Sequence, residues 1–280
     1  MKYYHSFMLG MLFIAMPMIT SASTGNDSIK VEKLLRGAAV LPADSNRILF
    51  FAKQLTGIPY AAGTLDEGAE ETLIVHLDKA DCTTFVETVL ALAMADKKGS
   101  RSFDSFKQAL QQIRYREGKP DGYASRLHYF SDWIKDNEQK GIVKERTGEI
   151  SSAIQVLQLD FMSTHPESYK QLKDNPVLTA QIAHREREWK NVSVFYFPKE
   201  QLNYPYYKMN IRNGDILAIT TNIKGLDVVH TGFACWVGGK LHLLHASSVM
   251  KKVILDPQPL YDYSKNKKAH TGVRVISFLP

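Results

Sequence analysis

Cys82 is the residue of this chain with the clearest capacity for covalent chemistry, because it stands at the start of a helix expected over residues 81–99. Asp81, immediately before it, is a typical N-cap, and Gly99 is a typical stop signal. The helix dipole and the free N–H groups of the first turn stabilise a thiolate. We therefore expect a lowered pKa of the Cys82 thiol and a nucleophile at neutral pH. A small buried core residue is the alternative interpretation.

Two histidines on a predicted β-hairpin could serve such a nucleophile. The dipeptide Gly238–Gly239 between two apolar strands predicts a tight two-residue turn, in which Val237 pairs with Lys240. Counting back from that pair makes His230 and His245 diagonal neighbours on one face of the hairpin. One imidazole can accept the thiol proton while the other orients it, and we expect His230 to be the base and His245 the orienting residue. Two core histidines without a catalytic role are the alternative.

The same register sends Cys235 and His242 to the opposite face of the hairpin. A zinc site built from these two residues and the histidine pair would need ligands that point in opposite directions, so we expect no metal. By the same logic a disulfide between Cys82 and Cys235 is disfavoured. Gly232 and Ala234 lie on the histidine face, where small side chains let a helix pack closely. We expect the helix that carries Cys82 to pack there.

The remaining elements follow an α+β order, with helices first and antiparallel strands later. Residues 28–57 have helical apolar spacing broken at Leu41–Pro42, and residues 57–68 form a loop rich in turn signals. Residues 71–80 alternate as in an extended segment, and residues 100–190 are mainly helical and polar. Strands are expected from residue 191 onward, chiefly at 192–197, 214–220, 228–237, 240–248 and 272–280.

Composition places the chain among ordinary globular proteins. It has 280 residues, of which 44% are hydrophobic and 23% are charged, and the 2 cysteines exclude a disulfide framework. The net charge of +6 comes from Lys and Arg scattered among acids, so no nucleic-acid partner is expected. The sequence contains no G-x-S-x-G serine motif, no P-loop and no dinucleotide fingerprint.

The N-terminus has the three-part layout of a secretory signal. Lys2 precedes an uncharged apolar run at 7–19, which is shorter than the ~20 residues that span a bilayer, and small residues follow at 20–23. We expect a signal peptide at 1–22 with cleavage near Ala22 or Ser23. The product would be a soluble periplasmic protein without membrane insertion, comprising one domain at 23–280 with a helical insertion at about 100–190.

Three segments resemble the NlpC/p60 superfamily of papain-like cell-wall cysteine hydrolases: DCTTFVE at 81–87, VVHTGFACWVGG at 228–239 and LLHASS at 243–248. The resemblance implies a papain-like core in which the cysteine helix packs on an antiparallel sheet. It assigns Cys82 as nucleophile, His230 as base and His245 as the third member of the triad. PYAAGTLDEG at 59–68 resembles the loop that supplies a substrate-side tyrosine, here Tyr60, and Asp81 matches the acid before the nucleophile.

The chain departs from the commonest superfamily pattern because Thr83–Thr84 follow the cysteine where Ser-Gly is usual. With SRLHYFSDWIKDN at 125–137 and GDILAITTNIKGLDVVHTG at 214–232, this departure resembles the N-acetylmuramoyl-L-alanine amidase-like branch. That branch implies cleavage between muramic acid and L-Ala in soluble peptidoglycan fragments, with 1,6-anhydro-muramic acid as the sugar and no cofactor. A γ-D-glutamyl–diamino-acid endopeptidase and a non-catalytic exported glycan-binding module are the alternatives.

Two further segments are candidates for substrate contacts. Arg126 is expected to line a cleft walled by residues 100–190 and to pair with a stem-peptide carboxylate, a contact suited to guanidinium. The aromatic run YPYY at 204–207 could stack on a sugar or simply pack against the protein. Asp81 also has two interpretations, since an amidase substrate has no free L-Ala amine for it to bind. In that case it acts only as the helix cap.

Overall fold

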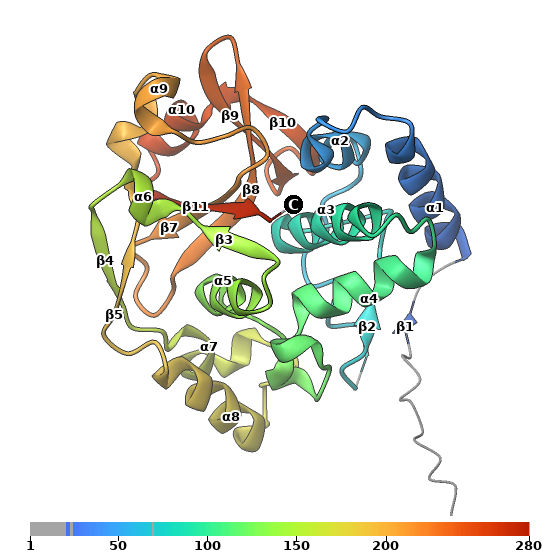
Figure 1. Cartoon of the computed structure of the whole chain (residues 1–280). Helices are drawn as coiled ribbons and strands as arrows, with labels where there is room; N and C mark the ends of the chain where they lie inside the picture. The colour runs from blue at the N-terminus through green and yellow to red at the C-terminus, as the bar shows by residue number, and fades with distance from the viewer. Residues whose placement is uncertain (1–20, 23–24, 69, 280) are drawn as a thin grey trace, which may run out of the picture.

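The computed structural model describes residues 21–22, 25–68 and 70–279. It has the expected α+β architecture, in which an antiparallel sheet carries helices on both faces (Figure 1). The helices are α1 (Gly25–Ala39), α2 (Arg47–Gln54), α3 (Cys82–Lys97), α4 (Phe103–Arg114), α5 (Phe130–Gln139), α6 (Thr147–Ile150), α7 (Phe161–Thr164), α8 (Pro176–Arg187), α9 (Tyr206–Met209) and α10 (Leu260–Lys265), with 3₁₀ turns η1 (Arg116–Gly118), η2 (Tyr123–Ser125), η3 (Pro166–Ser168) and η4 (Lys199–Asn203).

The main sheet has the strand order β10-β9-β8-β7-β11-β3, and β6 also pairs with β11. The strands are β1 (Ser21–Ala22), β2 (Leu73–Ile74), β3 (Val143–Glu145), β4 (Ile154–Leu157), β5 (Val192–Phe195), β6 (Phe197–Pro198), β7 (Ile216–Thr221), β8 (Val228–Val237), β9 (Lys240–Ser247), β10 (Lys252–Pro259) and β11 (His270–Phe278). All pairings within this sheet are antiparallel.

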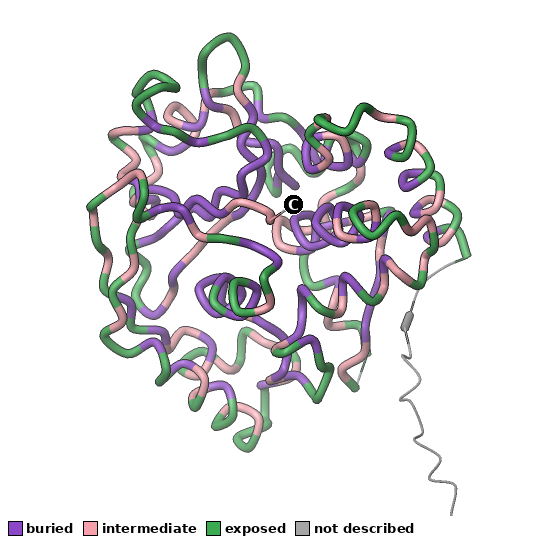
Figure 2. The backbone as a smooth tube through the Cα atoms, viewed as in Figure 1, coloured by how far each residue is buried: buried purple, intermediate pink, exposed green. Residues whose placement is uncertain are grey.

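Helix α3 lies at the centre of the larger core, where it packs against the sheet and helices α1, α2 and α4. Its middle turns are buried on all sides and are purple in Figure 2, while residues at both ends are partly exposed. Phe85 of α3 packs edge-on against Phe233 of β8, with ring centroids 5.6 Å apart. A second core lies on the other face of the sheet, where Ala234 and Leu243 pack with Leu260 of α10.

The prediction that α3 packs on the sheet face of Gly232 and Ala234 is wrong. The helix contacts the sheet face that bears Phe233 and Leu244, whereas Ala234 belongs to the opposite core. Gly232 is small for a different reason: a Cβ atom there would lie 2.8 Å from the Cβ atom of His245. The glycine therefore makes room for the neighbouring histidine rather than for the helix.

The first half of the chain follows the expected order, with α1 and α2 separated around Leu41–Pro42 and α3 beginning at Cys82. Only Leu73–Ile74 of the segment 71–80 forms a strand. Residues 100–190 contain the expected helices but also β3 and β4, and β3 extends the main sheet beside β11. Strand β10 was not expected, because Pro257 and Pro259 interrupt its pattern.

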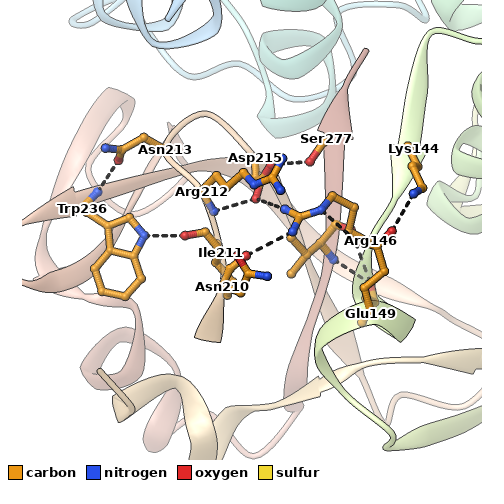
Figure 3. A network of polar contacts seen from close by, with 12 residues as sticks. Lys144, Arg146, Glu149, Asn210, Ile211, Arg212, Asn213, Asp215, Trp236 and Ser277 are labelled. Carbon is orange, nitrogen blue, oxygen red and sulfur yellow. Dashed lines mark hydrogen bonds and ion pairs between the residues drawn. The ribbon is translucent and has the colours of Figure 1, made fainter. Parts of the chain in front are cut away.

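A polar network fixes the turn end of the β8–β9 hairpin and the strands beside it (Figure 3). Asn213 accepts a hydrogen bond from the backbone N–H of Trp236 at 2.7 Å, and the Trp236 indole donates to the carbonyl of Ile211 at 2.8 Å. Asp215 accepts from Ser277 at 2.6 Å and pairs with Arg146 at 3.3 Å. The network joins the loop before β7 to β8, β11 and the segment after β3, so the hairpin is held firmly at the end opposite His230.

The expected signal peptide falls almost entirely on residues 1–20, which lie outside the described residues. Ser21 and Ala22 form β1, which pairs in parallel with Leu73 and Ile74. Within the residues that the structure describes, no helix combines the length and apolar character needed to cross a membrane.

Candidate active site

Cys82 is the first residue of α3, held there by a reciprocal capping box. The Asp81 carboxylate accepts from the backbone N–H of Thr84 at 2.8 Å, and the Thr84 hydroxyl accepts from the backbone N–H of Asp81 at 2.9 Å. The expected N-cap is therefore confirmed, and the Thr84 that departs from the usual superfamily pattern completes it. The Thr231 hydroxyl donates to the Cys82 carbonyl at 3.0 Å, which ties the start of α3 to β8 beside His230.

The expected lowering of the Cys82 thiol pKa is wrong. Burial raises the pKa of this thiol above its ordinary value, and the neighbouring Asp81 carboxylate raises it further. Hydrogen bonds with Thr231 and Thr83 act in the opposite direction but do not outweigh burial. The resting thiol is therefore neutral, and it needs a base to become a nucleophile.

The hairpin has the predicted register, with Val237 opposite Lys240. Gly238 and Gly239 have φ values of 55° and 76°, which are unstrained for glycine and match a type I′ turn. The register brings the two histidines together as expected: Nε2 of His230 lies 2.5 Å from Nδ1 of His245, with the rings at 87°.

A break in the β7–β8 pairing lies next to His230. Ile219 is opposite His230, but the next β7 residue, Thr220, is opposite Val228, so β8 has one extra residue at Val229. Such a bulge bends and twists the strand and re-aims neighbouring side chains. It lies at the end of β8 where Thr231 contacts Cys82.

Asp256 on β10 completes a chain of polar side chains that the sequence reasoning missed. Its carboxylate lies 3.3 Å from Nε2 of His245, and both residues are buried. Because the carboxylate only accepts, His245 must donate from Nε2 and accept at Nδ1. His230 then donates from Nε2, which leaves its Nδ1 as the basic nitrogen. Asp256 was missed because β10 was not predicted as a strand. In β10, Ile254 is paired with His245, and Asp256 is two residues further along the same strand.

The surroundings of His230 and His245 favour the neutral form of both imidazoles. Burial lowers the pKa of His230 to about 3, and the positive charges that His245, Lys267 and His270 can carry act in the same direction. Burial also lowers the pKa of His245, while Asp256 opposes that shift. His230 is therefore an unprotonated base at neutral pH. In the described part of the chain no hydrogen bond joins the Cys82 thiol directly to either imidazole.

Tyr60 lies close enough to the nucleophile to be affected by its charge. Burial raises the pKa of the Tyr60 hydroxyl, and the charges of Cys82 and Asp81 add to the shift. Its backbone N–H donates to the carbonyl of Lys251 at 2.9 Å, which fixes the loop beside the start of β10. The structure thus gathers Tyr60, Asp81 and Cys82 at one place.

Arg126 is buried and engaged by acidic side chains of the protein. It is 7% exposed, pairs with Asp66 at 2.7 Å and with Glu71 at 3.6 Å, and donates to the carbonyl of Leu65 at 3.1 Å. Lys170 donates to the carbonyl of Asp66 at 3.0 Å. These contacts hold the loop that carries Tyr60. A cavity of 420 Å³ lies between this loop, η2 and the region of α8.

The aromatic run 204–207 lies elsewhere. Tyr206 packs edge-on against Trp236 with ring centroids 5.0 Å apart, near the turn of the hairpin. Six strand positions separate Trp236 from His230, which is roughly 20 Å. Cys235 is paired with His242 across the hairpin, and both cysteines are free. Among the described residues no group of three or more His, Cys, Asp or Glu side chains is arranged to hold a metal ion.

An α+β protein with a helix-start cysteine beside a His–His–Asp chain is the class that the fold and the site define. The chain belongs to the N-acetylmuramoyl-L-alanine amidase-like family, whose model matches residues 50–273.

Solved structures are similar over most of the chain. An N-acetylmuramoyl-L-alanine amidase from Bacteroides uniformis is 40% identical with a TM-score of 0.79, and the match covers 84% of this chain and 98% of that one. A Bacteroides fragilis protein with a provisional description as a xylanase is 44% identical with a TM-score of 0.77, covering 81% and 99%. A Legionella pneumophila protein is 25% identical with a TM-score of 0.69, covering 91% and 95%. No curated protein matches the chain.

Proposed function

We propose that this protein is a cysteine-dependent N-acetylmuramoyl-L-alanine amidase of the NlpC/p60 superfamily. It would cut the amide between muramic acid, in its 1,6-anhydro form, and L-Ala of peptidoglycan fragments. The observation that carries the proposal is the hydrogen-bonded chain His230–His245–Asp256 at the end of β8 where Thr231 holds the start of α3. Family membership and the Bacteroides uniformis amidase support the choice of bond.

The mechanism starts from a neutral thiol and a neutral imidazole. When substrate is bound, Nδ1 of His230 takes the Cys82 proton, and the sulfur attacks the lactyl carbonyl carbon. The backbone N–H groups of Cys82 and Thr83 stabilise the oxyanion, since that of Thr84 is occupied by Asp81. His230 then gives its proton to the nitrogen of L-Ala, the C–N bond breaks, and a thioester remains. Water, deprotonated by His230, hydrolyses the thioester and regenerates the thiol.

His245 and Asp256 would act through His230. A carboxylate behind the second imidazole holds its tautomer and stabilises the positive charge that forms during proton transfer. At His245 this carboxylate opposes the burial that disfavours a protonated imidazole. Asp256 would therefore orient His245, His245 would orient His230, and only His230 would transfer a proton.

We assign Tyr60 to the substrate side, and the loop 57–68 and residues 100–190 to the cleft wall. Contacts from Arg126 and Lys170 to this loop support that assignment. Asp81, expected from the resemblance to bind substrate, acts in an amidase as the helix cap. We also propose that residues 1–22 are a signal peptide, which would direct the protein to the periplasm. One domain over 23–280, with 100–190 as an insertion, fits a family match that runs through the inserted residues.

Three alternative functions would give different results in a digest. An endopeptidase with the same triad would release L-Ala–D-Glu or its sugar-linked form, and a glycan-binding module would release nothing. A xylanase, the provisional description of the Bacteroides fragilis neighbour, would need two carboxylates flanking a glycosidic bond. At this site Asp256 is bonded to His245 and Asp81 caps a helix. We therefore favour amide hydrolysis.

Mass spectrometry of a muropeptide digest tests the proposal directly. The protein with residues 23–280 should release a peptide beginning with L-Ala and free 1,6-anhydro-N-acetylmuramic acid, and Cys82→Ala should release neither. Two other substrates should be cut more slowly: the same peptide on muramic acid with a free reducing end, and intact sacculi. L-Ala–D-Glu as the main product, or sugar oligomers from xylan, would overturn the proposal.

A further inference from the structure

Lys267 places an ammonium group beside the histidine pair. The residue follows α10 and is half-buried, and its Nζ atom lies 3.1 Å from the centre of the Tyr263 ring. That ring lies 5.6 Å from the His245 ring and 6.4 Å from the His230 ring. The Lys267 charge also lowers the pKa values of His230, His245 and His270. The ammonium is therefore part of the surroundings of the proposed base.

The ammonium forms no ion pair in the part of the chain that the structure describes, although the Asp256 carboxylate acts on it from a longer distance. Its contact with Tyr263 is a cation–π interaction, and no hydrogen bond or ion pair of its Nζ atom occurs among those residues. The Lys199 ammonium lies nearby, donating to the Lys267 carbonyl at 3.4 Å. Burial lowers the pKa of Lys267, and the charge of the Asp256 carboxylate opposes that shift without outweighing it. A ligand anion would supply a counter-charge in direct contact with the ammonium.

The proposed reaction indicates which part of the substrate that anion belongs to. His230 must give a proton to the departing nitrogen, so the leaving peptide lies on the histidine side of the scissile bond. The sugar side has no carboxylate, because the lactyl carboxyl is consumed in the amide. The peptide side has one on the residue after L-Ala, where a γ-linked D-Glu keeps its α-carboxylate free.

The distances are compatible with such a contact. The ammonium lies 3.1 Å from the Tyr263 ring centre, which lies 6.4 Å from the His230 ring centre, so the ammonium is within about 10 Å of the His230 ring. Two extended residues of a bound peptide span about 7 Å. Arg126, the residue expected from the sequence to bind a stem-peptide carboxylate, is buried against Asp66 and Glu71. Among the described residues, Lys267 is a cation beside the base that forms no ion pair of its own.

We propose that Lys267, held over the Tyr263 ring, binds the α-carboxylate of the residue after L-Ala and thereby selects acidic leaving peptides. The inference rests on the proposed amidase function. It makes Lys267 a specificity residue that contacts the substrate but takes no part in proton transfer. Replacing the carboxylate by an uncharged amide should remove most of its effect.

The test compares two substrates that differ in one charge: 1,6-anhydromuramoyl–L-Ala–D-Glu and the same compound with D-isoglutamine. The wild-type protein should favour the carboxylate form by about tenfold in kcat/KM, chiefly through KM. Lys267→Met should lose that preference, so that its kcat/KM values for the two compounds become equal, and Lys267→Arg should retain part of the preference. Lys268→Met, an exposed neighbour, is the charge-matched control and should keep the preference.

A binding measurement separates this inference from the proposed function. Calorimetry on Cys82→Ala, which binds without cutting, should give about tenfold tighter binding of the carboxylate form than of the amide form. Lys267→Met in that background should abolish the difference. Equal binding or equal kcat/KM for the two compounds in the otherwise unchanged protein would overturn the role of Lys267 alone. A wild-type protein that prefers the carboxylate form in binding but releases no L-Ala peptide would overturn the amidase proposal alone.

Discussion

Nε2 of His230 lies 2.5 Å from Nδ1 of His245, and the two rings are nearly perpendicular. Because Asp256 occupies the other nitrogen of His245, this contact has one direction: His230 donates and His245 accepts. The basic nitrogen of His230 is then Nδ1. The arrangement resembles the nucleophile–base–orienter logic of thiol and serine hydrolases, with one more residue behind the orienter.

Cys82→Ala should abolish hydrolysis and leave the fold unchanged, because it removes one sulfur from a capped helix start. Muropeptide turnover and the melting temperature measure the two effects. Iodoacetamide at neutral pH should label Cys82 before Cys235, since Cys82 is half-buried and Cys235 is 5% exposed. Faster labelling of Cys235 would contradict both the hairpin orientation and the mechanism.

His230→Ala should lower kcat by about 10²–10⁴-fold, the usual contribution of a general acid–base group. His245→Ala should cost less, because His245 orients but does not transfer the proton. Rates for the two variants on one muropeptide decide the matter. Negligible losses in both would mean that the pair is merely part of the core.

Asp256→Asn should lower kcat about 10²-fold or more, and by more than Asp256→Ala does. The new amide can donate to Nε2 of His245, which reverses the tautomer and leaves Nδ1 of His230 protonated. Measuring kcat of the two variants at saturating substrate tests this. If the alanine variant were the slower enzyme, Asp256 would have a packing role and no part in setting the tautomer.

The acid limb of the kcat/KM profile should fall well below the ordinary histidine range. Lowering the pH protonates His230 and removes the base, and its pKa is about 3. Activity should therefore persist at pH 5 and disappear toward pH 3. Circular dichroism at each pH controls for unfolding, and an acid limb centred near pH 6.5 in the folded protein would contradict the neutral buried imidazole.

Folding stability should also fall as the pH drops below about 6.5. The folded protein holds His230 with a pKa near 3, so between these values the unfolded chain binds more protons and is stabilised relative to the folded chain. The contribution is complete above pH 6.5 and is lost as the pH approaches 3. Urea unfolding at pH 7, 6 and 5 measures the slope. His230→Gln should flatten it by up to about 1.4 kcal/mol per pH unit.

Arg126→Ala should lower the free energy of unfolding by about 3 kcal/mol, because it leaves the largely buried Glu71 carboxylate without its cation. It should also raise KM, since the loop with Tyr60 loses its anchor. Arg36→Ala removes an exposed pair with Glu32 and should change stability by less than about 1 kcal/mol. A loss of affinity in Arg126→Ala without a loss of stability would instead indicate direct substrate contact.

Much of the site could be predicted because its signals are local. The cap at Asp81 and the turn at Gly238–Gly239 depend on residues next to one another in the chain. Once that turn is set, the alternation of side chains along two strands determines that His230 and His245 meet. Local rules of this kind need no knowledge of what packs on either face.

Other features depended on contacts between distant segments. The face on which α3 packs, the position of Asp256 behind His245 and the burial of Arg126 each require strands or loops far apart in the sequence to meet. The thiol pKa is the clearest case. The helix start favours the thiolate, but burial and the Asp81 charge prevail, because the cost of desolvating a charge depends on the whole packed surroundings. By itself the sequence determined which residues could react, while the tertiary structure decided their protonation states and partners.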